Sequence, residues 1–313
     1  MDLAKEIING NITALGKGIT LIESTLPEDE KKSQELLAKC FKKSGNSIRI
    51  GITGVPGVGK STFIETFGKL LTSKGKKVAV LAIDPTSIKT KGSILGDKSR
   101  MTKLSSDNNA FIRPSPSGGT LGGIADKTSE IIILCEAAGF NIILIETVGV
   151  GQSETTVSNL VDFFLLLMLA GAGDELQGIK RGIMELADML LITKADGDNY
   201  QKAKNAATEY KRALHLFPPM QNKWIRQVNT CSALKNTGIL EILEIINDFN
   251  SQMLLSNWKI KNRTNQKKYW LHHKIKEDFG NKKYKSLLTS GKLKLLEEEL
   301  LQGKTLYNLI ERL

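Results

Sequence analysis

Gly54-Val55-Pro56-Gly57-Val58-Gly59-Lys60-Ser61-Thr62 is the stretch that decides the fold of this chain. It matches the phosphate-binding pattern G-x-x-x-x-G-K-[ST], in which glycines let the backbone wrap around a polyphosphate and turn its N–H groups inward. Residues 47–53 before it alternate like a strand, and residues 62–71 after it have helical spacing. We therefore expect a strand, a phosphate-binding loop and a helix whose positive end faces the ligand. The pattern predicts that the protein binds a nucleoside triphosphate.

Two residues of this stretch have specific roles in the prediction. Lys60 should reach the β- and γ-phosphates, and the hydroxyl of Ser61 should bind Mg²⁺. The alternative is an ordinary glycine-rich turn before a helix. The strand and helix on either side favour the phosphate site.

The composition is that of an ordinary globular protein with room for a large core. The chain has 313 residues, of which 41% are hydrophobic and 25% charged. The longest apolar run, residues 163–170, is too short to cross a bilayer, and the first residues lack the apolar core of a signal peptide. Cys40, Cys135 and Cys231 are isolated and odd in number, which favours a reducing compartment. We expect a cytoplasmic protein without membrane contact.

The net charge of +11 is concentrated near the C-terminus, where ten Lys and Arg between Lys259 and Lys285 face only Glu277 and Asp278. Such an excess could attract nucleic acid or an acidic partner. The alternative is a solvated helical face in a lysine-rich protein, and we favour it because no nucleic-acid motif accompanies the charge.

The pattern along the chain predicts three parts. Residues 1–46 have helical spacing and form an N-terminal extension, residues 47–253 alternate strands with helices, and residues 254–313 are a helical C-terminal extension. Strands are expected at 47–53, 77–83, 111–113, 140–146, 163–169, 189–193 and 225–230. The fold class is therefore α/β, a P-loop NTPase with a mainly parallel central sheet flanked by helices.

A second nucleotide motif, Thr193-Lys194-Ala195-Asp196, follows one of these strands. The carboxylate of Asp196 can accept hydrogen bonds from the ring N1–H and the 2-amino group of guanine, which adenine does not offer there. Lys194 would pack its stem over the base. The alternative for Asp196 is a helix cap. After the last strand, Ser232, Ala233 and Leu234 could offer backbone N–H groups to the guanine carbonyl.

Candidate metal and catalytic carboxylates lie between these motifs. They are Asp84 and Glu146, each at a strand end, and Asp97. Mg²⁺ usually takes one or two carboxylates besides phosphate oxygens, so some of the three would act through water or orient the attacking water. Helix caps or surface charges are the alternative. In the loop 170–180, Lys180, or its neighbour Arg181, could supply positive charge to the transition state. The alternative there is a simple connection with solvated charges.

Together these stretches resemble the MeaB/ArgK family of P-loop GTPases, also called methylmalonyl-CoA mutase-associated GTPases or methylmalonic aciduria type A proteins. The resemblance runs from about Ile19 to Asn250. Besides the phosphate loop it rests on Leu21-Ile22-Glu23-Ser24, Ile83-Asp84-Pro85-Thr86-Ser87, Gly92-Ser93-Ile94-Leu95-Gly96-Asp97-Lys98, Phe111-Ile112-Arg113-Pro114-Ser115-Pro116-Ser117, Glu146-Thr147-Val148-Gly149-Val150-Gly151-Gln152-Ser153-Glu154 and Gly171-Ala172-Gly173-Asp174-Glu175-Leu176-Gln177-Gly178-Ile179-Lys180.

The resemblance implies a GTPase that forms a homodimer, largely through its C-terminal helical extension (residues 254–313). It also implies that this GTPase chaperones an adenosylcobalamin-dependent acyl-CoA mutase, usually methylmalonyl-CoA mutase. The GTPase would gate cofactor loading and protect or reactivate the mutase, and a cobalamin adenosyltransferase is a conceivable second partner. By the same resemblance, residues 54–62 hold the phosphates of GTP or GDP, Asp196 reads guanine, and residues 232–234 complete the base site. Asp84, Asp97 and Glu146 correspond to the carboxylates that organise Mg²⁺ and water, while Asp174 and Lys180 fall in the mobile loop that responds to the mutase.

Two points separate this chain from the family pattern. The family usually has Asn where this chain has Thr193, and Asn would add a hydrogen bond to the loop. The lysine-rich segment after residue 254 also matches least well. Two alternative functions stay open: an ATP-using kinase or energiser of basic amino-acid (lysine, arginine or ornithine) transport, and a nucleic-acid-binding regulator that uses residues 259–285.

Overall fold

A computed structural model describes residues 2–83, 101–113, 121–147, 153–171 and 181–313. The chain divides into two compact units. The first contains Met1–Ser47, Gly119–Asn141 and Ile260–Leu313, and the second contains Ile48–Gly118 and Ile142–Lys259. Residues 119–141 thus group with the two terminal segments. The division at residues 46 and 253 that the sequence suggests stays a prediction.

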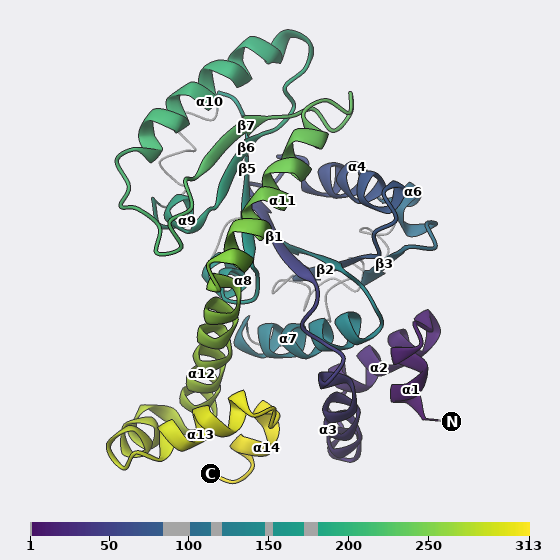
Figure 1. The fold of residues 1–313 in the computed structure, drawn as a ribbon, viewed down its shortest axis with the longest axis vertical. Helices are drawn as coiled ribbons and strands as arrows, with labels where there is room; N and C mark the ends of the chain where they lie inside the picture. Colours follow the sequence, from purple (N-terminus) through teal and green to yellow (C-terminus); the bar gives the residue numbers. More distant parts are fainter. Residues whose placement is uncertain (1, 84–100, 114–120, 148–152, 172–180) are drawn as a thin grey trace. The chain divides into compact units, whose positions relative to one another are not determined.

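The second unit is built on a parallel sheet (Figure 1). Its described strands follow the order β3-β2-β4-β1-β5-β6-β7, and every neighbouring pair is parallel. This confirms the predicted fold class. The strands are β1 (Ile48–Gly54), β2 (Val78–Ile83), β3 (Ala110–Arg113), β4 (Ile142–Thr147), β5 (Phe163–Met168), β6 (Met189–Ile192) and β7 (Gln227–Thr230).

The central strands are buried along almost their whole length. Every residue of β4, β5 and β6 is buried, as is all of β1 except Arg49, so both faces of this part of the sheet are covered. Since all strands point the same way, their carboxyl ends meet at one edge. The order of β4, β1 and β5 places the loop that follows β1 at the middle of this edge.

Helices of the second unit pack their apolar sides on the sheet or on its loops. In Figure 1, α10 runs beside β6 and β7. In α11, Phe249 makes edge-to-face contacts with Phe163 of β5 and with Trp224, at centroid distances of 5.0 and 5.1 Å. The described helices of this unit are α4 (Lys60–Ser73), α6 (Thr102–Ser105), α8 (Ser153–Ser158), α9 (Arg181–Leu186), the 3-10 helix η3 (Gly197–Asn199), α10 (Tyr200–Leu214) and α11 (Ile239–Leu255).

Two carboxylates, the half-buried Asp162 and the buried Asp188, lie where two strands begin. Asp162 accepts the N–H of Arg49 at 2.9 Å, and Asp188 accepts the N–H of Phe164 at 2.8 Å. Burial raises the pKa of Asp188 to about 7, while the hydrogen bond from Phe164 acts in the opposite direction. Each carboxylate thus caps the start of the neighbouring strand.

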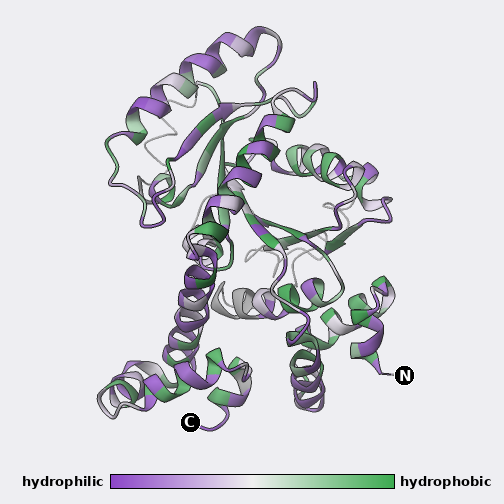
Figure 2. Cartoon of the chain, in the orientation of Figure 1, coloured by the Kyte–Doolittle hydropathy of each residue, from purple (hydrophilic) through white to green (hydrophobic). Residues whose placement is uncertain are grey.

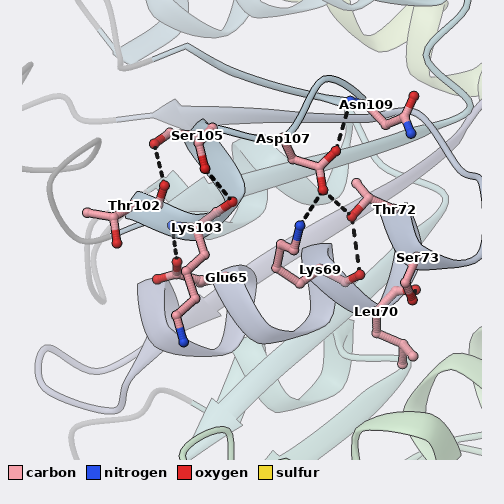
Figure 3. Close-up of polar contacts among 11 residues, drawn as sticks. Glu65, Lys69, Leu70, Thr72, Ser73, Thr102, Lys103, Ser105, Asp107 and Asn109 are labelled. Carbon is pink, nitrogen blue, oxygen red and sulfur yellow. Dashed lines mark hydrogen bonds and ion pairs between the residues drawn. The ribbon is translucent and has the colours of Figure 1, made fainter.

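The short helix α6 is held on α4 by polar contacts (Figure 3). Glu65 accepts the N–H of Lys103 at 2.7 Å, and Asp107 accepts hydrogen bonds from Lys69 and, at 2.8 Å, from Thr72. The Lys69 ammonium, foremost among these groups, lowers the pKa of Asp107 to about 2. These contacts attach the segment that leads into β3 to the helix that follows the phosphate loop.

The first unit is helical. The buried Gly18 lets α2 approach Ile7, Leu36 and Leu134 closely, because a Cβ there would lie 2.8–3.3 Å from those side chains. A separate apolar cluster includes Leu271 and Ile275 of α12 together with Leu293, Leu296 and Leu300 of α13. The elements are α1 (Leu3–Ile8), α2 (Ile12–Glu23), α3 (Pro27–Phe41), α7 (Leu121–Ala137), α12 (Trp258–Thr289), α13 (Lys292–Leu301) and α14 (Leu306–Ile310).

The long helix α12 is largely hydrophilic (Figure 2) and bends at Gly280, whose φ of 75° and ψ of 170° are not helical. No helix among the described residues combines the length and the hydropathy that crossing a bilayer requires.

Two opposite charges of the first unit hold the segment just before β1. Glu136 of α7 accepts the N–H of Gly45 and the hydroxyl of Ser47, each at 2.6 Å. Arg263 of α12 donates to the carbonyls of the same two residues, each at 2.7 Å. Its Nη1 lies 3.6 Å from Oε1 of Glu136, and the two side chains are 13% and 1% exposed. We call these four residues the β1 clamp.

Candidate nucleotide-binding site

The phosphate loop predicted from the sequence connects β1 to α4. Three of its glycines have positive φ: Gly54 (151°), Gly57 (78°) and Gly59 (97°), the last being the N-cap of α4. A Cβ on Gly54 would lie 2.5 Å from the carbonyl oxygen of Leu167 in β5. Glycine is therefore required at residue 54 both by its backbone angle and by the neighbouring strand.

Lys60 and Ser61 begin α4 and lie at the carboxyl edge of the sheet. The ammonium of Lys60 donates to the carbonyl oxygens of Gly54 at 2.8 Å and Val55 at 3.3 Å, so its side chain folds back over the loop. The hydroxyl of Ser61 donates to Oε1 of Glu146 at 3.3 Å. Glu146 is only 6% exposed, and it aligns with Ile52 of β1.

Ser61 and Glu146 together present a hydroxyl and a carboxylate, the hard oxygen donors that suit Mg²⁺. The donor set therefore fits this cation. Among the described residues, no group of three or more His, Cys, Asp and Glu side chains could hold a metal ion. The other predicted ligands, Asp84 and Asp97, lie outside the described ranges, and so does Lys180.

A pocket of about 100 Å³ lies beside the phosphate loop. It brings together residues from the loop, from α4 and from the segments that follow β6 and β7. Every residue that the sequence analysis assigned to the base site lines it. The lining residues are Val58, Gly59, Thr62, Phe63, Thr193, Lys194, Asp196, Ser232, Ala233 and Leu234.

Asp196 is held in the pocket by Ser232. The fully buried Ser232 hydroxyl donates to Oδ2 of Asp196 and accepts the N–H of Lys235 at 3.1 Å. Lys194 has a positive φ of 55°. Its Cε lies 3.9 Å from the position that a Cβ on Gly59 would take, so its stem runs past the phosphate loop. Leu234, 79% exposed, offers an apolar side chain to the pocket.

Thr193 makes a bond that the sequence analysis associated with Asn. Thr193 is 4% exposed, and its hydroxyl lies 2.7 Å from the carbonyl of Val58 in the phosphate loop and 3.2 Å from that of Met168. The threonine thus forms the contact to the loop itself.

Sequence reasoning missed Thr66 and Phe63. Phe63 lines the pocket, and the hydroxyl of Thr66 donates to the carbonyl of Ala233 at 3.2 Å. The available signal was helical spacing, because Thr66 lies four residues after Thr62 and hence on the same side of α4.

Comparisons with known proteins identify the family of the chain. The model of the family described as methylmalonyl Co-A mutase-associated GTPase MeaB matches residues 15–286. GTPase ArgK of Escherichia coli is 46% identical over 277 residues, which cover 88% of this chain and 84% of that protein. The mouse methylmalonic aciduria type A homolog, mitochondrial, is 46% identical over 282 residues, or 87% of this chain and 68% of that protein.

A solved structure described as a LAO/AO transport system kinase has a TM-score of 0.78 and 36% identity, and the match covers 99% of this chain and 96% of that one. These findings confirm the family resemblance. The chain therefore belongs to the methylmalonyl-CoA mutase-associated GTPase MeaB family, and it is a GTPase.

Proposed function

We propose that this GTPase is a chaperone for an adenosylcobalamin-dependent acyl-CoA mutase, specifically methylmalonyl-CoA mutase. GTP binding and hydrolysis would gate cofactor loading and would protect or reactivate the mutase. The observation that carries the GTP part is the pocket that joins Asp196 to the phosphate loop. The mutase part is supported by the family's description and by the name of the mouse relative.

The phosphates would lie in the loop of residues 54–62. Its inward N–H groups, the start of α4 and the ammonium of Lys60 would bind them, and Lys60 would exchange its carbonyl partners for phosphate oxygens. Ser61 and Glu146 would hold Mg²⁺, with Asp84 and Asp97 as further ligands or water-orienting groups. When bound, Mg²⁺ would neutralise negative charge on the phosphoryl group during its transfer.

The base would lie in the pocket beside the loop. Asp196 would accept hydrogen bonds from N1–H and the 2-amino group of guanine, with Ser232 fixing the carboxylate. Lys194 would cover one face of the base with its stem. Ala233 and Leu234 would complete the pocket.

Asp196→Asn tests this assignment. An amide keeps one acceptor but loses the charge, and hydrogen bonds to charged groups contribute about 1.5–3 kcal/mol. We expect GTP affinity to fall about tenfold to hundredfold, while the affinity for XTP, whose 2-oxo group can accept from the amide, rises. Calorimetric titration with GTP, XTP and ATP measures this. The control is Asp198→Asn, an exposed carboxylate two residues further on. If Asp196→Asn kept the base preference of the wild type, Asp196 would not be the residue that recognises guanine.

The chaperone proposal predicts that turnover depends on the partner. Slow GTP hydrolysis by the chain alone should rise on the order of tenfold or more when an adenosylcobalamin-dependent acyl-CoA mutase from the same cell is added.

Lys180→Ala should reduce the stimulated rate more than the basal rate. Phosphate release with and without the mutase measures both. If the mutase did not stimulate hydrolysis, the proposal that it is the partner would be wrong. If Lys180→Ala lowered the basal and the stimulated rate equally, Lys180 would have no specific role in the response to the mutase.

A second candidate function is that of a kinase in basic amino-acid transport, which the description of the similar solved structure favours. Incubation with a periplasmic binding protein and γ-labelled ATP or GTP separates the two, since only a kinase would transfer the label to that protein. The assignment of Asp196 to guanine argues against an ATP-using enzyme. A homodimer formed through residues 254–313 and a cytoplasmic location complete the proposal.

A further inference from the structure

Lys194 of the base motif has a backbone conformation that residues with a side chain rarely adopt. Its φ is 55°, in the left-handed region, where the Cβ crowds the following carbonyl oxygen. A residue keeps such a conformation only when its surroundings hold it there. Neighbouring groups must therefore fix the backbone at Lys194.

The peptide unit between Lys194 and Ala195 is hydrogen-bonded through both of its polar groups. The N–H of Ala195 donates to the carbonyl of Cys231, the residue that follows β7, at 2.9 Å. The carbonyl of Lys194 accepts a hydrogen bond from the side-chain amide of Asn199 at 2.7 Å. Because a peptide unit is planar, these two bonds fix its orientation and with it the ψ of Lys194. Asn199 supplies one of the two bonds.

Asn199 lies where an asparagine usually has a different role. It is the N-cap residue of α10, and an asparagine there typically accepts an N–H from the first turn of the helix. Within the described part of the chain its side chain makes no such capping bond, and it donates to Lys194 instead. The backbone N–H of Asn199 donates to the carbonyl of Asp196 at 3.1 Å. Asn199 thus holds the carbonyls of the two motif residues on either side of Ala195.

The backbone conformation of Lys194 decides where its stem lies. The stem runs past Gly59, and Lys194 lines the pocket together with Asp196. If Lys194 relaxed to a negative φ, its Cα–Cβ bond would change direction, since β6 before it is fixed in the sheet. We propose that Asn199 is a positioning residue of the base pocket, whose amide keeps Lys194 left-handed and its stem over the guanine base. The proposal rests on the function proposed above.

Asn199→Ala removes the amide and tests the proposal. We expect GDP affinity to fall about threefold to tenfold, a modest loss because the bond is exposed and water can replace part of it. Calorimetric titration with GDP–Mg²⁺ measures the affinity, and thermal melting records the folded state. The matched control is Asn205→Ala, which removes an exposed asparagine of α10 that pairs with Gln201. It should bind GDP like the wild type.

Asn199→Asp separates positioning from helix capping. Aspartate has the shape of asparagine and caps helices equally well, but its carboxylate cannot donate to the carbonyl of Lys194. We therefore expect this variant to melt close to the wild-type temperature and still to lose at least as much GDP affinity as Asn199→Ala. If it bound GDP like the wild type, Asn199 would act through its shape or as a cap, and the inference would be wrong.

A double-mutant cycle tests whether Asn199 acts through Lys194. Lys194→Ala removes the stem and should weaken GDP binding about tenfold. Adding Asn199→Ala to this variant should lower the affinity by no more than about a further twofold, because the amide then has no stem to position. A residue that only stabilised the fold would cause the same loss in both backgrounds.

The remaining outcomes are distinguishable. A folded Asn199→Ala variant with wild-type GDP affinity would overturn the inference and leave the proposed function intact. Losses that multiply in the double variant would also overturn it, because Asn199 would then affect the nucleotide by a route other than Lys194. A wild-type chain that did not bind GDP would overturn the proposed function together with this inference.

Discussion

Lys60→Ala is expected to weaken GTP binding on the order of a thousandfold and to abolish measurable hydrolysis. The ammonium of Lys60 lies 2.8 Å from the carbonyl of Gly54, directly over the loop that would hold the phosphates. Two charge-assisted hydrogen bonds to phosphate oxygens contribute about 3–6 kcal/mol together. Alanine can supply neither bond, and it also leaves the phosphate charge uncompensated. Calorimetric titration with GTP–Mg²⁺ and release of inorganic phosphate measure the two effects.

The matched control for this substitution is Lys74→Ala. Lys74 is the exposed C-cap of the same helix, at the end opposite the phosphate loop, so its loss removes one positive charge without touching the site. It should bind GTP like the wild type. Tight GTP binding by a folded Lys60→Ala variant would mean that the phosphates do not lie in the loop of residues 54–62.

Glu136→Leu is expected to lower the free energy of unfolding by about 3–5 kcal/mol, because it removes the acidic member of a largely buried ion pair. The carboxylate is 1% exposed and accepts hydrogen bonds from Gly45 and Ser47, so leucine removes the acceptor of these two groups together with the carboxylate that faces Arg263. Denaturant titration followed by circular dichroism measures the change.

A double variant distinguishes the charge from the packing. When Arg263→Leu is added to Glu136→Leu, both charges of the pair are removed, and the combined loss should be smaller than the sum of the single losses. Lys39→Ala breaks an exposed pair with Asp2 and should leave the free energy of unfolding nearly unchanged. If Glu136→Leu were as mild as Lys39→Ala, the clamp would not contribute to stability.

The sequence predicted the elements whose signal is local. Residues 163–168 form a continuous apolar run, and the structure has β5 at Phe163–Met168 because that strand is covered on both faces. The last strand was expected from residue 225 but begins at Gln227. The reason is tertiary, since the backbone N–H of Gln227 and the indole of Trp224 both donate to the carbonyl of Asp188. Ladder pairing with β6 starts only there.

Elements that are held by residues far away in the sequence show no local sequence pattern of their own. The four residues of α6 are too few to show a helical period, and Glu65 and Lys69 of α4 hold that segment in place. The same holds for the site. The phosphate loop and the base motif are short contiguous patterns. By contrast, the bond from Thr193 to Val58 spans 135 residues and that from Thr66 to Ala233 spans 167. Bonds of this kind depend on how the strands are ordered in the sheet.

Gly54 belongs to the phosphate-binding motif, but the packing of the sheet requires glycine at this residue independently of any ligand. Its missing side chain makes room for the backbone of β5, since any Cβ would lie 2.5 Å from the oxygen of Leu167. A descendant of this chain that had lost all affinity for nucleotides would still have to keep glycine there as long as β5 stayed beside β1. If a relative that no longer binds nucleotides kept this glycine, the reason would be the packing of β1 beside β5, and the glycine would not indicate remaining GTPase activity.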